Sequence, residues 1–286
     1  MKKITLFTAV FLLGCISARC QRLSIDVMPG LMNYAGDLQP SSLTFNQACI
    51  GAEIGLQYQL TDKIYLRADY LAGQVKADDK RGIKDFAIRR NLNFKSIILE
   101  GSVSVEYDFY RLRIDKNWTP YVFAGVGYYF FNPYTYDTAG NKYYLQPYGT
   151  EGQGLAQYPE RKFYKLYQFN IPAGLGLKYA VSDRVSIGFE VGFRKLFTDY
   201  LDDVSTTYPN QNALSNARGP VAVELSFRQG EINPNAVYTD GALRGSSAHK
   251  DDYYTGLFRL TYTLGANKDG FSAGYKKSVS CPKPVL

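Results

Sequence analysis

Residues that usually carry out catalysis are scarce in this 286-residue chain. Its one histidine is His249, and a Ser or Cys nucleophile usually needs such a base nearby. Zinc and iron–sulfur sites need several Cys or His ligands, and the chain has only four Cys. We therefore expect no catalytic site and no cofactor, with His249 at the surface.

Acidic residues offer one possible metal site. Asp199, Asp202 and Asp203 lie close together in the sequence. Carboxylates together with backbone carbonyls are ligands that calcium prefers. Three acids in one loop are, however, more often simply hydrated. We expect no metal here, and calcium at these three residues is the weaker alternative.

Other charged side chains alternate with apolar ones. Glu53, for example, lies between Ala52 and Ile54, so the two kinds of residue face opposite sides of an extended chain. Charges of both signs confined to one face should pair, because an unpaired buried charge costs several kcal/mol. The predicted network consists of Glu53, Arg67, Asp69, Glu100, Glu106, Lys178, Glu190, Arg194 and Arg259. We expect it to be structural, and gating or ligand binding is the weaker alternative.

The elements that would position these charges are strands, of which residues 48–74 are the clearest example. Two arms alternate polar and apolar residues with period two around a turn at 61–63. Each arm is long enough to cross a bilayer when tilted, since about 9 to 11 residues suffice. So long a repeat, with charges opposite the apolar face, fits a lipid-facing exterior and a polar lumen better than a soluble sandwich.

This pattern recurs along the chain. The segments that follow it are 23–33, 48–60, 64–74, 96–109, 121–130, 167–179, 185–194 and 254–264. The connections between them alternate long and short, and the long loops of outer-membrane barrels lie outside the cell. Residues 221–228 also alternate, but a ninth strand would give an odd number, so we assign them to a loop. The prediction is an all-β, eight-stranded antiparallel transmembrane β-barrel with long extracellular loops and short periplasmic turns.

The N-terminus carries the parts of an export signal. Lys2 and Lys3 precede an apolar run that ends at Leu13 and is followed by small residues. We expect cleavage before Gln21, with lipidation at Cys15 as the alternative. The predicted organisation is therefore a signal peptide at 1–20, a barrel at 21–264 and a periplasmic tail at 265–286. No later run approaches the roughly 18 apolar residues of a membrane-spanning helix.

Charge and cysteine content exclude two further classes. Loss of Lys2, Lys3 and Arg19 with the signal lowers the formal charge from +7 to +4, which is too mild to indicate nucleic-acid binding. Cys49 and Cys281 would then be the remaining thiols, at opposite ends of the chain. They indicate no disulfide framework.

Four segments of the chain are distinctive. They are NYAGDLQP at 33–40, RRNLNF at 89–94, YYLQPYGTEGQG at 143–154 and TDYLDDVSTTY at 198–208. These segments resemble an outer-membrane barrel family of the Bacteroidota that includes the PorG-like barrel component of the type IX secretion system. The resemblance covers nearly the whole mature chain. It implies an outer-membrane location among lipid, and a structural role beside the periplasmic ring of the secretion and gliding apparatus.

With this resemblance, the tail becomes a candidate for partner contact. Lys276, Lys277 and Lys283 could steer an acidic surface of a ring protein, and a hydrated tail is the alternative. Two other functions stay open. A small transporter or receptor would need a lumen that opens, whereas a surface adhesin would need only the long loops.

Overall fold

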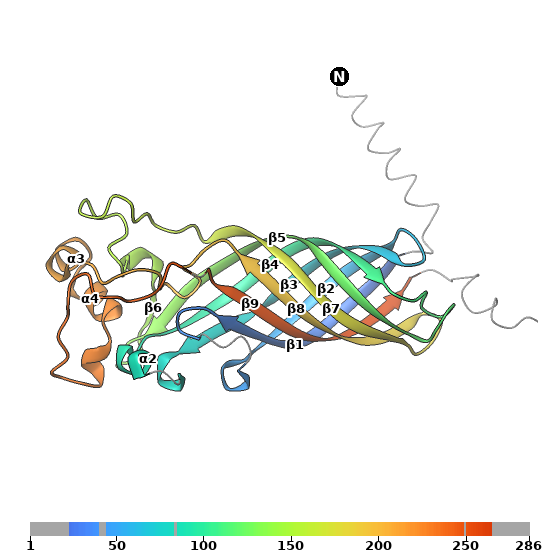
Figure 1. Ribbon diagram of the computed structural model, residues 1–286, viewed down its shortest axis with the longest axis horizontal. Coiled ribbons are helices and arrows are strands. Elements are labelled where there is room, and N and C mark those ends of the chain that lie inside the picture. Colours follow the sequence, from blue (N-terminus) through green and yellow to red (C-terminus); the bar gives the residue numbers. More distant parts are fainter. Residues whose placement is uncertain (1–22, 40–43, 83–84, 249, 265–286) are drawn as a thin grey trace, which may run out of the picture.

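Eight antiparallel strands close into a barrel in the computed structural model, which describes residues 23–39, 44–82, 85–248 and 250–264 (Figure 1). The strands follow the order β4-β3-β2-β1-β9-β8-β7-β5, and β5 pairs with β4 to complete the ring. Their bounds are Leu23–Ala35 (β1), Cys49–Gln59 (β2), Ile64–Asp78 (β3), Asn93–Asp108 (β4), Trp118–Tyr136 (β5), Tyr167–Ala180 (β7), Val185–Leu196 (β8) and Asp252–Thr263 (β9). A short strand, β6 (Lys142–Tyr144), pairs with the end of β5. The predicted eight-stranded barrel is confirmed.

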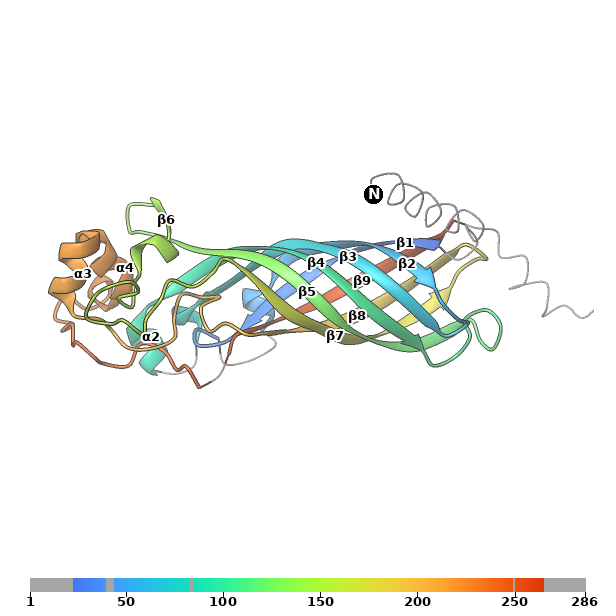
Figure 2. The same cartoon turned by 90° about the horizontal axis from the view of Figure 1, so that it is seen from above.

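The two ends of the barrel differ in the length of their connections (Figures 1 and 2). Short turns join the strands at one end. The first and last described residues, Leu23 and Leu264, lie at this same end and are hydrogen-bonded to each other. The other end carries the long connections, with helices η2 (Phe45–Gln47), η3 (Asp79–Arg81), α2 (Asp85–Arg90), η4 (Gln146–Tyr148), α3 (Gln211–Arg218), α4 (Pro220–Ser226) and η5 (Gln229–Glu231). Because long loops of such barrels face outward, we call this the outer end. Residues 221–226, which alternate like a strand, belong to α4.

The barrel exterior carries an apolar belt with aromatic pairs at its edges. Side chains such as Ile54, Val103 and Phe258 are exposed on it. Aromatic pairs in edge-to-face or tilted contact are Tyr107–Phe109 and Tyr110–Trp118 toward the inner end, and Tyr128–Phe169 and Phe130–Tyr167 toward the outer end. An apolar band between aromatic girdles is the lipid-facing surface of an outer-membrane barrel. The protein therefore lies in the outer membrane. Among the described residues, no helix combines the length and the hydrophobicity that a membrane crossing requires.

The polar–apolar alternation inverts toward the outer end. The inner part of β3 turns Arg67 into the lumen and Leu66 outward, whereas its outer part turns Val75 inward and Lys76 outward. Near the outer end, the barrel wall is surrounded by water and encloses an apolar core. Polar residues therefore face outward and apolar residues face inward there. This core contains Met32, Tyr34, Leu38, Leu71, Val75, Ala77, Leu92, Phe94, Ile98, Tyr129, Phe131, Leu145, Tyr164, Leu196, Leu201, Val204, Leu225 and Tyr253.

This inversion explains where the predicted strand ends were wrong. The outer ends expected for the third, fourth and fifth strands were residues 74, 96 and 130. The strands continue to Asp78, Asn93 and Tyr136. Polar and apolar residues still alternate there, but the apolar ones face inward. A search for strands with apolar residues on the outside therefore stops too early.

Candidate functional site: an ion network beneath an outer cap

The inner half of the lumen is occupied by ionic side chains, which we call the lumen network. Its carboxylates are Asp26, Glu53, Asp69, Glu100, Glu106, Asp108 and Glu190, and its cations are Arg67, Lys178, Arg194 and Arg259. None of these residues is more than 8% exposed. Every strand of the barrel except β5 contributes a charge to it.

Arg67 is the central cation of the lumen network. Its guanidinium nitrogens lie 2.7 Å from Glu190, 3.1 Å from Glu53 and 3.2 Å from both Glu106 and Asp69. These acids come from β8, β2, β4 and β3, so one side chain joins opposite walls of the barrel. Planar guanidinium groups suit this role because they offer five donors in a fixed geometry.

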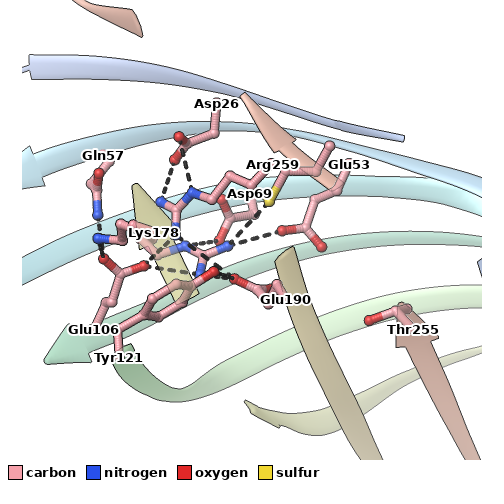
Figure 3. A network of polar contacts seen from close by, with 12 residues as sticks. Asp26, Glu53, Gln57, Asp69, Glu106, Tyr121, Lys178, Glu190, Thr255 and Arg259 are labelled. Carbon is pink, nitrogen blue, oxygen red and sulfur yellow. Dashed lines mark hydrogen bonds and ion pairs between the residues drawn. The ribbon is translucent and has the colours of Figure 1, made fainter. Parts of the chain in front are cut away.

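Glu106 is the carboxylate that receives the most cations (Figure 3). Arg259 approaches it to 2.6 Å, and Lys178 also donates to it. The side-chain amide of Gln57 donates to the same carboxylate at 2.6 Å. Arg259 in turn holds Asp26 at 2.7 Å, so the ion pairs form one connected set rather than separate bridges.

Arg194 links the lumen network to the apolar core above it. Its guanidinium lies 2.9 Å from Glu53 and 3.5 Å from Glu100. Glu100 also accepts hydrogen bonds from Asn170, at 2.6 Å, and from the hydroxyl of Tyr253, a core residue. The lumen therefore changes from ionic to apolar at the level of Glu100.

All nine charges predicted from the alternation lie in the lumen network. Sequence reasoning missed Asp26, which faces Arg259, and Asp108, which lies 2.9 Å from Lys178. Both follow the same alternation as their strand neighbours Ile25 and Tyr107, so that rule would have found them.

The distinctive sequence segments meet at the outer end, where they form a folded structure that we call the outer cap. Each of the four supplies residues to the apolar core, for example Leu38, Leu92, Leu145 and Leu201. Segments far apart in the sequence thus share one core. The outer cap lies beyond the ends of the barrel strands in both views (Figures 1 and 2). The outer cap comprises residues 37–39, 79–82, 85–92, 137–166 and 197–248, with 250 and 251.

Two arginines organise the outer cap. Arg90 pairs with Asp79 through two nitrogens, each 2.8 Å from a carboxylate oxygen. It also donates at 2.5 Å to the backbone carbonyl of Arg244. Arg244 lies 3.1 Å from Glu151 and donates at 2.6 Å to the backbone carbonyl of Asp203. Asp79 and Arg90 are both buried, so the connection between β3 and β4 is anchored by an ion pair inside the outer cap.

Glu151 fastens two of the distinctive segments to each other. Its carboxylate accepts hydrogen bonds from the backbone amides of Ser205 and Thr206, at 2.9 and 3.0 Å. The hydroxyl of Thr206 donates to it at 2.7 Å. Glu151 is completely buried, so these donors replace the water that it loses.

Asp202 and Asp251 share one hydroxyl group. The oxygen of Tyr34 lies 2.5 Å from Asp202 and 3.0 Å from Asp251. A hydroxyl has a single hydrogen, so two full hydrogen bonds at Tyr34 require that one of the two acids donates a proton of its own. Burial raises the pKa of both carboxyl groups well above the ordinary value, and each is raised further by acidic neighbours.

The three calcium candidates lie in the outer cap but face different protein donors. Asp199 accepts from Ser205 at 2.7 Å, and Asp203 accepts from the hydroxyls of Thr150 and Tyr164 at 2.5 and 2.8 Å. The expectation that they are hydrated is wrong, because Asp199, Asp202 and Asp203 are at most 3% exposed. Within the part of the chain that the structure describes, no three His, Cys, Asp or Glu residues form a grouping that could hold a metal ion.

Several predicted features fall outside the described residues. These are the signal segment at 1–20 with Cys15, His249, Cys281, and the tail with Lys276, Lys277 and Lys283. Cys49, at the start of β2, is a free thiol.

Comparison with solved structures returns small outer-membrane proteins. Neisserial surface protein A has a TM-score of 0.39 and 11% identity, covering 84% of this chain and 96% of that one. OprG from Pseudomonas aeruginosa has a TM-score of 0.40 and 10% identity, covering 85% and 96%. Ail, the attachment invasion locus protein of Yersinia pestis, has a TM-score of 0.38 and 11% identity, covering 85% and 97%.

Comparison with sequences gives a family but no characterised relative. No curated protein sequence matches this chain significantly. The family described as "Domain of unknown function (DUF6089)" matches residues 2–224. This match spans most of the chain. It includes every barrel strand except β9, and it covers the outer cap as far as residue 224. The protein belongs to the DUF6089 family.

Proposed function

We propose that the protein is a closed, structural barrel of the type IX secretion and gliding apparatus, and that it holds the periplasmic ring at the outer membrane. The observation that carries this proposal is the filled lumen. The lumen network occupies its inner half, and the apolar core with the outer cap occupies the rest. A barrel built in this way is suited to anchoring other proteins and poorly suited to passing solutes.

The interactions inside the lumen argue against a small transporter. Opening a path along the axis would break several contacts of Arg67 at once, including those to Glu53 and Glu190. Removing one partner from a buried ion pair costs about 3 to 5 kcal/mol. A transport cycle that repeatedly broke such a network would have a large free-energy barrier.

The assignment to the secretion apparatus rests on the four segments that resemble an outer-membrane barrel family which includes the barrel component of that apparatus. They lie together in the outer cap, so the likeness concerns one three-dimensional feature and not four scattered matches. Contact with a periplasmic ring would have to use the opposite, inner end. There the connection between β4 and β5 exposes Ile114 beside the ion pair Arg111–Asp115, which spans 2.8 Å.

A pair of matched variants tests the proposal. Ile114→Asp changes an exposed apolar residue at the inner end, and Val237→Asp changes one in the outer cap. The test variant combines Ile114→Asp with Lys276→Glu, Lys277→Glu and Lys283→Glu. We expect it to reduce copurification of ring proteins and to impair secretion. Val237→Asp should do neither. Each barrel must first be shown to be inserted, by its different gel migration before and after boiling.

The same variants weigh a second function. The outer cap is a folded, extracellular structure, which is what a surface adhesin would need. If Val237→Asp weakens cell attachment while deletion of the whole protein leaves secretion and gliding intact, the adhesin function replaces the secretion role. Conductance of wild-type protein in planar bilayers would instead favour a transporter.

A further inference from the structure

Two lysines face each other on the outer wall of the barrel. Lys76 of β3 and Lys95 of β4 are direct partners in the antiparallel ladder, and both side chains point outward beyond the apolar belt. Directly opposed residues have Cβ atoms about 4.5 to 5.5 Å apart, and like charges at this distance are destabilising. The sequence thus keeps two like charges opposite each other on an outward face, where a neutral residue in place of either lysine would remove the repulsion.

The opposite side of the barrel avoids this arrangement. Lys195 of β8 has Asp252 of β9 as its direct partner, and the two form an ion pair at 3.1 Å. The two sites have comparable positions near the outer ends of their strands. Only the Lys76–Lys95 pair has no acid across the ladder, so a general need for charged residues at this height does not explain it.

A third lysine lies next to this pair. Lys142 of β6 places its ammonium 3.8 Å from the ring centre of Tyr134 and 4.5 Å from that of Tyr144. Tyr134 is itself the ladder partner of Lys95. We call Lys76, Lys95 and Lys142 the basic rim. Lys142 donates one hydrogen bond, at 3.1 Å, to the hydroxyl of Tyr144, and Lys95 lies 5.4 Å from the ring centre of Tyr136. Aromatic faces attract ammonium groups without using their hydrogens as donors to oxygen, so both lysines keep hydrogens that can donate to a ligand.

Acids in the neighbourhood do not neutralise the basic rim. Asp78, two residues beyond Lys76, uses its carboxylate to accept from the backbone amide of Lys80. Asp137 accepts from the backbone and the side chain of Asn141, at 2.8 and 2.9 Å. Across the described ranges, none of the three lysines of the basic rim forms an ion pair.

Below the basic rim, the lipid-facing wall is hollowed. Gly101 of β4 faces outward, with open space where a side chain would be, and its ladder partners Tyr70 and Tyr128 flank it. They line a surface groove of about 590 Å³ whose other walls include Val103 and Phe169. Lys95 lies six residues farther out on the same face of β4, roughly 20 Å along the strand. That separation matches an acyl chain in the groove and a charged headgroup at the rim.

We propose that the basic rim binds the phosphate groups of lipopolysaccharide, with an acyl chain of the same molecule in the groove at Gly101. The rim lies at the outer edge of the apolar belt, which is the height of the headgroups in the outer leaflet. Phosphate oxygens between Lys76 and Lys95 would turn their repulsion into a shared attraction, and Lys acts as a point charge toward phosphate. This inference is independent of the secretion role.

A binding experiment with full-length protein in neutral detergent tests the proposal. The probes are bisphosphorylated lipid A, lipid A without phosphates, phosphatidylglycerol and inorganic phosphate. The test variant is Lys76→Gln/Lys95→Gln/Lys142→Gln, and Lys195→Gln is the matched control. We expect wild type and control to prefer bisphosphorylated over dephosphorylated lipid A at least tenfold, and the triple variant to lose this preference.

Three results would contradict the proposal. One is equal affinity of the triple variant and wild type for bisphosphorylated lipid A. Another is a failure of wild type to distinguish it from the dephosphorylated lipid, and the third is equally tight binding of phosphatidylglycerol or inorganic phosphate. Inner-leaflet lipid or a free ion would then be the ligand.

Stability measurements keep the test decisive if the triple variant folds poorly. Lys95→Gln alone removes the repulsion, so its unfolding midpoint in neutral detergent should rise above that of wild type. With bisphosphorylated lipid A present, the order should reverse, because wild type gains more from the ligand. An unchanged order with the lipid present would overturn the proposal.

Discussion

The lumen network and the outer cap neutralise buried acids in different ways. In the lumen, seven carboxylates face four cations, and every cation contacts at least two acids. In the outer cap, six buried carboxylates, namely Asp79, Glu151, Asp199, Asp202, Asp203 and Asp251, face the two guanidinium groups of Arg90 and Arg244. Hydroxyls and backbone amides take the place of the missing cations, and burial raises the pKa of Asp202 and Asp251, which favours their protonated forms.

This difference follows from the elements that hold each region. Strands fix long Arg side chains from opposite walls at one height, where a guanidinium reaches several acids. Loops instead bring many backbone N–H groups close together, and carboxylates are good acceptors for them. The lumen should therefore depend on charge, whereas the outer cap should depend on protonation and hydrogen-bond geometry.

The largest effect is expected for Arg67→Met in the lumen. This change leaves Glu53, Glu106 and Glu190 without their shared cation, and loss of one partner in a buried pair costs about 3 to 5 kcal/mol. We expect a loss near the upper end of that range in urea unfolding of the refolded barrel. Lys195→Met, in a partly exposed pair, is the control. A stable Arg67→Met barrel would show that hydrogen bonds and protonation can replace a cation in the lumen, as they do in the outer cap.

Matched amide substitutions should have opposite consequences in the two regions. Asp26→Asn removes the charge that Arg259 holds, and we expect a cost of about 3 kcal/mol. Asp202→Asn keeps the shape of a protonated acid beside Tyr34, so stability should stay within about 1 kcal/mol of wild type. Equilibrium unfolding at neutral pH measures both. Equal losses would remove the distinction between the regions.

The stability of the outer cap should fall as pH rises. Burial raises the pKa of Asp199 and Asp203 to about 6, and that of Asp202 and Asp251 well above the ordinary value. Because the folded cap binds more protons than the unfolded chain above about pH 4, its stability is complete below that pH. It is lost in part between about pH 4 and 6, and further at higher pH as the last two acids ionise. For one acid whose pKa rises to about 6, the effect is on the order of 3 kcal/mol.

Amide hydrogen exchange can follow this pH dependence locally. After correction for intrinsic rates, amides such as those of Leu201 and Val204, which donate to Asp251 and Asp202, should exchange faster at pH 7.5 than at pH 4.5. Strand amides around the lumen network serve as the internal reference. Greater protection of the outer cap at the higher pH would contradict the raised pKa values.

The smallest effect is expected for the ion pair Lys195–Asp252. Its side chains are 45% and 17% exposed, and exposed pairs contribute about 0 to 1 kcal/mol. Lys195→Gln should therefore shift the unfolding free energy by less than about 1 kcal/mol, with a smaller shift at high salt. A loss comparable to that of Asp26→Asn would mean that burial does not set the scale of these interactions.

The sequence was sufficient for the lipid-spanning part of the barrel because one alternation rule governs it. Glu53 and Arg67, for instance, occupy positions whose facing is fixed by their apolar neighbours. The same rule failed at Lys76 and Val75, because the environment on the two sides of the wall exchanges there. The outer cap had no such rule. Glu151 meets Ser205 and Thr206 across more than fifty positions of irregular chain, and no local period announces such a contact.

The uninterrupted ladder between β3 and β4 has a mechanical consequence. It runs through fifteen residue pairs, from Ile64 and Tyr107 at the inner end to Asp78 and Asn93 under the outer cap. β5 has nineteen residues, a span of roughly 63 Å. A pull on the outer cap along the strands would load these hydrogen bonds in shear, shared by all eight ladders around the ring. The barrel should therefore transmit tension between the cell surface and the periplasm as one stiff unit.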